Sequence, residues 1–207
     1  MKENLTEMVF ILDRSGSMSN LTQDTIGGFN TMIENQKKED GEAILTTVLF
    51  DDKYELLHDG VNIKDVNKLT NKEYFARGMT ALLDAIGKTI NTVGERLNKT
   101  KEEDKPSKVI FVITTDGQEN SSREFTQEQI KEMIEHQTNT YNWQFMFLGA
   151  NIDAVSTAQS FGINGQFASN YTANSRGTDA LYSSVSKSVA SFRSVGVVDS
   201  DWKKDLE

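Results

Sequence analysis

Short, continuous runs of apolar residues alternate along the chain with longer segments in which apolar residues recur every three or four positions. The runs are typical of strands covered on both faces, and the recurring positions are typical of helices with one buried face. The predicted strands cover 8–12, 43–50, 53–61, 109–113, 143–148 and a last short segment, 165–169. The predicted helices cover 17–38, 80–97, 126–137, 153–161 and 178–193. This alternation predicts an α/β fold with a mostly parallel sheet and helices on both faces.

Two local signals add detail to this pattern. Only Asp51 and Asp52 separate the second and third predicted strands, so these strands are expected to form a hairpin with the third strand at an edge of the sheet. Thr126, followed three residues later by Gln129, predicts a capping box at the start of one helix.

Composition narrows the class of protein. The chain has 207 residues, of which 37% are hydrophobic and 26% charged, as expected of one globular domain with a substantial core. Its net charge of -9 argues against nucleic-acid binding, which depends on clustered Lys and Arg. The absence of cysteine and the presence of only two histidines exclude a disulfide framework, a thiolate nucleophile and a Cys- or His-rich metal site.

Targeting features are also absent from the sequence pattern. The first residues, MKENLTEMVFILDRS, contain a short apolar run interrupted by Asp13 and do not read as a signal peptide. No window reaches the length and apolarity of a membrane-spanning helix. We therefore expect a cytoplasmic protein that does not interact with a membrane.

Candidate chemistry lies where two predicted strands end. Asp13 directly follows the first strand and Asp116 follows the strand 109–113, so both should lie at the same edge of a parallel sheet, where ligands bind in such folds. Ser15 and Ser17 complete a D-x-S-x-S pattern, which offers one carboxylate and two hydroxyls to a single point. Oxygen ligands of this kind suit a hard cation, with Mg²⁺ favoured.

Thr80 is a candidate for a further hydroxyl ligand, since it lies at the start of the predicted helix 80–97, just after Gly78. Each of these residues also has an ordinary structural explanation. Thr80 and Ser17 are suitable helix N-caps, and Asp116 followed by Gly117 is a common turn. The joint placement of all of them beside strand ends favours a metal site.

The same residues resemble those of a von Willebrand factor type A domain, whose metal ion-dependent adhesion site combines a D-x-S-x-S motif with a distant Thr and a distant Asp. The matching segments are DRSGS (Asp13, Ser15, Ser17), GMT (Thr80) and TTDG (Asp116), and the resemblance extends over roughly residues 5–195. The segment GMTALLDAI also looks like a pattern found in many bacterial and phage members.

The resemblance implies a Rossmann-like three-layer α/β/α sandwich with one antiparallel edge strand. It also implies Mg²⁺ or Mn²⁺, and protein binding rather than catalysis. We therefore expect one domain over residues 1–198, a loose polar tail over 199–207, and a partner that presents an Asp or Glu carboxylate to the metal. A chaperone-type ATPase is one such partner in bacterial and phage members, and in animal members the last helix can shift on binding.

Other residues beside the proposed metal have a less specific interpretation. Four of them lie in loops where they would either shape partner choice or simply be exposed, namely Arg14, Met18, Arg77 and Met79. Glu119 and Asn120 follow Asp116 and are similarly placed.

The main alternative is a metal-dependent hydrolase or phosphatase with Asp13 as the nucleophile. Enzymes of the haloacid dehalogenase type need a second carboxylate two residues after that aspartate, and this chain has Ser15 there. A lysine-containing loop at 99–108 could suggest nucleic-acid binding, but its lysines alternate with acidic residues, as in a solvated loop.

Overall fold

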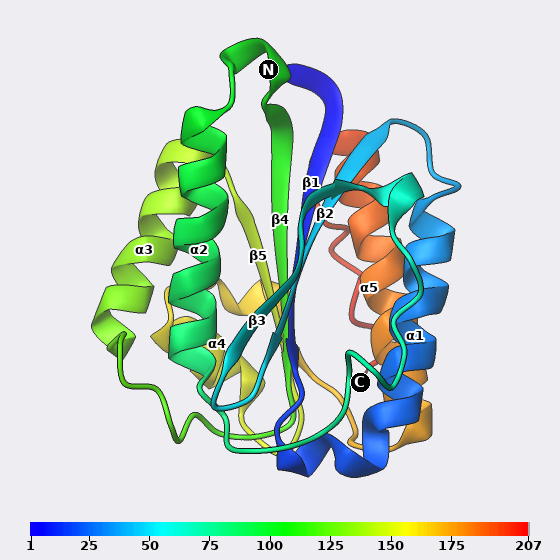
Figure 1. Ribbon diagram of the computed structural model, residues 1–207, viewed down its shortest axis with the longest axis vertical. Helices are drawn as coiled ribbons and strands as arrows, with labels where there is room; N and C mark the ends of the chain where they lie inside the picture. Colours follow the sequence, from blue (N-terminus) through cyan, green and yellow to red (C-terminus); the bar gives the residue numbers. More distant parts are fainter. Residues whose placement is uncertain (207) are drawn as a thin grey trace.

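A six-stranded sheet in the order β3-β2-β1-β4-β5-β6 forms the centre of the molecule, seen nearly edge-on in Figure 1. The computed structural model describes residues 1–206. The strands are β1 (Lys2–Asp13), β2 (Glu42–Phe50), β3 (Tyr54–Asn62), β4 (Pro106–Thr115), β5 (Gln144–Gly149) and β6 (Ala168–Asn170). All neighbours pair in parallel except β2 and β3. The predicted hairpin and its antiparallel edge strand are therefore confirmed.

Helices cover both faces of this sheet (Figure 1). They are α1 (Thr22–Gln36), α2 (Leu82–Lys99), α3 (Gln127–Tyr141), α4 (Ala154–Ser160) and α5 (Ser175–Val195). Helices α1 and α5 pack on one face, and α2, α3 and α4 pack on the other. The fold is thus the expected three-layer, Rossmann-like α/β/α sandwich. The capping box of α3 is also present, with Thr126 and Gln129 bonding each other's backbone N–H.

The central strand β1 explains why the sequence has an uninterrupted apolar run there. Met8, Phe10 and Leu12 belong to the core between the sheet and α1 and α5, whereas Val9 and Ile11 belong to the core on the opposite face. Successive side chains of a strand point to opposite faces, so a strand buried on both sides must be apolar at every position.

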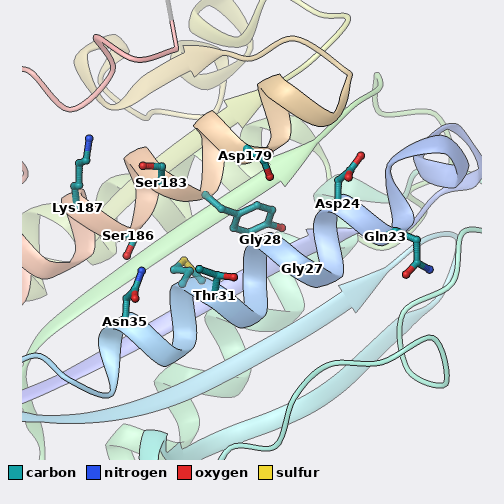
Figure 2. Close-up of a pocket in the computed structure, with 12 residues that line it drawn as sticks. Gln23, Asp24, Gly27, Gly28, Thr31, Asn35, Asp179, Ser183, Ser186 and Lys187 are labelled. Atoms are coloured by element: carbon teal, nitrogen blue, oxygen red, sulfur yellow. The ribbon is translucent and has the colours of Figure 1, made fainter.

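Helices α1 and α5 lie side by side and approach closely at Gly28. A Cβ at this position would be 2.3 Å from the ring of Tyr182, so only glycine lets that buried ring lie against α1. Figure 2 shows the surface groove between these helices, with Asp24, Gly27, Thr31 and Asn35 on α1 and Asp179, Ser183 and Lys187 on α5. The groove has a volume of about 590 Å³, and none of the five predicted metal ligands lines it.

The starts of two helices differ from the prediction. Ser17 lies in a short 3-10 helix, Gly16–Leu21, and α1 begins only at Thr22, so Ser17 does not cap α1. Likewise α2 begins at Leu82 with Ala81 in the N-cap position, so Thr80 is not its cap.

The reason for the late start of α2 is that another loop caps this helix. The carboxylate of Glu119 accepts a hydrogen bond from the backbone N–H of Leu83 at 3.0 Å, and Ser122 Oγ accepts one from that of Asp84 at 3.0 Å. These side chains bind the free N–H groups that a local cap would otherwise bind.

The loose tail expected over 199–207 is wrong for its described part, residues 199–206. Trp202 is only 7% exposed and belongs to the core beneath α5, and its indole N–H donates to the carbonyl of Gln166 at 2.9 Å. Asp205 forms an ion pair of 2.8 Å with Lys187 of α5. Trp202 and Asp205, together with Leu206, which packs partly buried against the same core, thus hold a largely polar segment against the domain. Within residues 1–206, no helix combines the length and apolarity needed to cross a membrane.

Candidate metal centre

Asp13 ends β1 at the carboxyl edge of the sheet and is only 1% exposed. One carboxylate oxygen, Oδ1, accepts a hydrogen bond from the backbone N–H of Ser15 at 2.7 Å. The other, Oδ2, accepts one from Thr115 Oγ1 of β4 at 2.6 Å. The hydroxyl of the buried Tyr74 donates to the Asp13 carbonyl at 2.5 Å. The end of β1 is therefore fixed in position, and so is the carboxylate it carries.

A continuous series of contacts links the serines of the motif to the second aspartate. The hydroxyl oxygens of Ser15 and Ser17 are 3.1 Å apart. Ser17 Oγ in turn donates to Asp116 Oδ1 at 2.5 Å. Asp116 follows β4 directly, and β4 pairs with β1, so the two aspartates reach this edge from neighbouring strands.

Thr80 comes from a loop far away in the sequence and lies next to the same group. A Cβ built on Gly117 would be 3.8 Å from Ser17 Oγ and 3.9 Å from Thr80 Oγ1, so both hydroxyls face the same small residue. Asn120 fixes the backbone of Thr80 from two directions: its Oδ1 accepts from Thr80 N at 2.9 Å, and its own N–H donates to Thr80 O at 3.0 Å. All five predicted residues therefore lie together at one edge of the sheet.

Three supporting residues have no ligand role in the sequence pattern but hold this group together. Thr115 and Tyr74 fix Asp13, and Asn120 fixes Thr80. Thr115 lies within the TTDG segment and Asn120 follows it closely, so their proximity was visible in the sequence. Tyr74 is separated from Asp13 by 61 positions, and nothing local points to it.

Burial makes the two carboxylates of this group electrostatically unfavourable when no cation is present. Loss of hydration raises the pKa of Asp13 from 3.8 to about 6, although the hydrogen bonds from Thr115 and Ser15 act to lower it. Burial also raises the pKa of Asp116. Within residues 1–206 no group of three or more His, Cys, Asp and Glu could hold a metal ion. The donors that fit a divalent cation here are thus two carboxylates and neutral hydroxyls, all of them oxygen.

Metal binding is expected to weaken as the pH falls below about 6. Asp13 must be deprotonated to hold a cation, and its pKa of about 6 means that protons and metal compete for it near that pH. With one competing group, the affinity should fall about tenfold per pH unit below this pKa, and the raised pKa of Asp116 should make the fall steeper. Titrations with Mn²⁺ followed by electron paramagnetic resonance test this. An equal affinity at about pH 5 and about pH 7 would contradict it.

Of the loop residues expected to be exposed beside the candidate metal centre, some are buried in the structure and others are exposed. Arg14 is fully buried, with ion pairs to Asp51 at 3.0 Å and to Glu55 at 2.7 Å, and Met18 is buried too. These two residues are therefore structural. Met79, by contrast, is 53% exposed, as expected for a residue open to a partner.

No known family profile matches the sequence, and no curated protein matches it. Solved structures do match. One is proximal thread matrix protein 1 from the mussel byssus, solved with zinc in its metal ion-dependent adhesion site (MIDAS) motif. It superposes with a TM-score of 0.62 at 14% identity, over 92% of this chain and 47% of that protein. Manganese-loaded TRAP protein of Plasmodium vivax gives a TM-score of 0.59 at 18% identity, over 86% of this chain and 72% of that one.

A von Willebrand factor type A protein from Catenulispora acidiphila gives a TM-score of 0.58 at 12% identity, over 91% of this chain and 43% of that one. These likenesses show that this chain has the von Willebrand factor type A fold. It spans less than half the length of the mussel protein, so it corresponds to one part of that protein.

Proposed function

We propose that this protein is a divalent-metal-dependent protein-binding module whose metal is held by Asp13, Ser15, Ser17, Thr80 and Asp116. The observation that carries the proposal is the contact series at the sheet edge, in which oxygen atoms from three distant segments meet. A cation would offset the cost of burying the carboxylates there.

The same donor set explains why such a site would bind another protein. Hydroxyls and two carboxylates leave a divalent ion with residual positive charge and with coordination positions to fill. A Glu or Asp carboxylate of a partner is the natural complement, and the closed interface would strengthen the bond because its dielectric constant is low. All donors are hard oxygen atoms, which favours Mg²⁺ or Mn²⁺ as the resident ion. The zinc and manganese in two solved structures of this fold support a divalent cation in general.

We also propose that the module binds rather than catalyses. A phosphoryl-transferring hydrolase with Asp13 as nucleophile would need a second carboxylate two residues later as general acid. Ser15 occupies that position, and its hydroxyl lies 3.1 Å from that of Ser17. Hydrolysis of a generic phosphoester that depends on Mg²⁺ and is lost in Asp13→Asn would overturn this part of the proposal.

The setting of this function follows from the resemblance of the motif segments to bacterial and phage members of the family. On that basis we propose a cytoplasmic protein that works with a protein partner such as a chaperone-type ATPase. The acidic net charge of -9 accords with a partner other than nucleic acid.

Capture of partner proteins from a cell extract tests the proposal. The immobilised protein is expected to retain a partner in Mg²⁺ and to release it in EDTA, and Asp13→Ala should retain none because a principal ligand is missing. Asp179→Ala provides a matched control, since Asp179 is an exposed acidic residue on α5 that does not belong to the metal centre. Retention that persists in both EDTA and Asp13→Ala would disprove metal-dependent binding.

A further inference from the structure

A pocket of about 330 Å³ opens directly beside the metal centre, between the β2–β3 turn, the first turn of α2 and the loop after β4. Met79 and Ala81 both line it, and these residues flank Thr80, so the pocket and the predicted ligand share one short segment. Its apolar floor includes Phe50 and Ala85. A partner side chain that lies next to a metal-bound residue would reach this pocket.

Some of the charged side chains that line the pocket already have partners in the protein, and the charges of the others do not cancel. Asp84 accepts hydrogen bonds from the backbone N–H groups of three consecutive residues, 123–125, at 2.9, 2.9 and 3.0 Å. Glu124 forms an ion pair of 2.6 Å with Lys88. Asp52 lies against Gly78, where a Cβ would be 2.0 Å from its Oδ1, but it forms no ion pair with any residue of 1–206. Two of the three acids of the pocket, Asp84 and Glu124, thus already face other groups, and Asp52 does not.

The remaining cations are Lys53 and Arg123, which line the pocket from opposite loops. Neither side chain forms an ion pair with any residue of the described chain, 1–206, although the protein carries a net charge of -9. The hydroxyl oxygen of Ser121, also in the lining, is buried and has no hydrogen-bond partner there. Lys53 and Arg123 together outweigh the charge of Asp52, so the pocket favours an anionic side chain above its apolar floor.

We propose that this pocket receives a second carboxylate of the partner, so that the module recognises an acidic segment with two carboxylates, one for the metal and one for Lys53 and Arg123. This inference rests on the proposed metal-dependent binding function and specifies its partner. A Glu side chain fits the pocket because its methylene groups can lie on the floor while its carboxylate reaches the cations. The metal then sets affinity and the pocket sets sequence preference.

Binding of synthetic peptides to the intact protein in Mg²⁺ tests this inference. The reference probe is a fluorescent peptide of Gly and Ser with a single Glu. A panel adds a second Glu at increasing spacing, and each member has a counterpart with Gln in the second place. One spacing is expected to bind about tenfold more tightly than the reference and its Gln counterpart, a gain typical of one charge-assisted contact. NMR shift titrations extend the measurement to weak affinities.

Variants assign that gain to the pocket. Lys53→Ala and Arg123→Ala should each remove most of the tenfold gain while leaving the affinity for the single-Glu peptide unchanged. Lys99→Ala is the matched control, since Lys99 is 78% exposed at the end of α2, and it should keep the gain. If the single-Glu peptide binds only with Mg²⁺ but no second Glu adds affinity, the pocket inference fails and the proposed function stands. If no peptide binds in a metal-dependent way, both fail.

Discussion

Asp13→Asn is expected to raise the free energy of unfolding of the metal-free protein at neutral pH and to abolish its response to Mg²⁺. Burial raises the pKa of Asp13 from 3.8 to about 6, so the folded state binds a proton more tightly than the unfolded state does. The metal-free protein therefore loses stability as the pH rises from about 4 through about 6, by about 2 to 3 kcal/mol in total. Asparagine is neutral at every pH and avoids this loss.

The hydrogen bonds around position 13 allow this exchange. The amide oxygen of asparagine can still accept from the backbone N–H of Ser15, as Oδ1 of Asp13 does. Its amide N–H can donate to Thr115 Oγ1. The Thr115 hydroxyl can in turn donate to the carbonyl of Gly117, whose oxygen is 3.2 Å from Oγ1. No buried polar atom is left without a partner, so the substitution removes the charge and little else.

Urea unfolding in EDTA and in Mg²⁺ measures both effects. In EDTA at neutral pH the variant should be more stable than the wild type. Near pH 4 this advantage should largely disappear, because the folded wild type then carries a neutral carboxyl at position 13, as the variant carries a neutral amide, and the unfolded wild type is itself partly protonated. In Mg²⁺ the wild type should gain stability and the variant should not. Asp179→Asn, an exposed acidic residue outside the site, should behave as wild type. A variant less stable than the wild type in EDTA, or one still stabilised by Mg²⁺, would contradict the assignment of Asp13.

The features that sequence predicted well are those set by local pattern. The run from Met8 to Leu12 is apolar at every position because β1 has a core on each of its faces, and this alone places β1 inside the sheet. Once β1 and β4 are parallel neighbours, Asp13 and Asp116 must reach the same edge. The meeting of these two residues follows from topology and needs no knowledge of side-chain packing.

The features that sequence predicted poorly depend on contacts between distant segments. The start of α2 is set by Glu119 and Ser122, which lie 36 and 38 positions from the backbone groups they bind. The place of Thr80 depends on Asn120, 40 positions away. By residue type and position, Thr80 is a suitable N-cap for α2. The local sequence does not indicate that side chains of another loop already cap this helix.

The prediction for the C-terminal segment also failed because of a contact with a distant part of the chain. Its polar composition predicts a solvated tail, yet Trp202 is buried in the core beneath α5. One aromatic side chain buries a large apolar area, and this outweighs the preference of its neighbours for water. Average composition over a segment does not reveal a few anchoring residues such as Trp202 and Leu206.

Arg96→Met is expected to destabilise the protein by about 3–5 kcal/mol at neutral pH, the usual cost of leaving a buried charge without its partner. Glu7 lies in the middle of the sheet on β1 and is fully buried. Its carboxylate pairs with the guanidinium of Arg96 on α2 and accepts a hydrogen bond from Thr46 at 2.9 Å. Gly60 permits this approach, because a Cβ there would be 2.9 Å from Arg96 Nη1. Methionine retains much of the packing of the arginine stem but none of its charge.

The pH dependence and a double variant distinguish this charge effect from a simple loss of packing. Burial already raises the pKa of Glu7, and removal of Arg96, which lowers that pKa, should raise it further. The deficit of Arg96→Met should therefore be largest at neutral pH and shrink as the pH falls and the carboxyl is protonated. Glu7→Gln combined with Arg96→Met should recover most of the lost stability, since no buried charge remains. Urea unfolding of the three variants at several pH values measures this. If the double variant were as unstable as Arg96→Met alone, or if the deficit did not change with pH, the loss would come from packing. The ion pair between β1 and α2 would then not be what stabilises the protein.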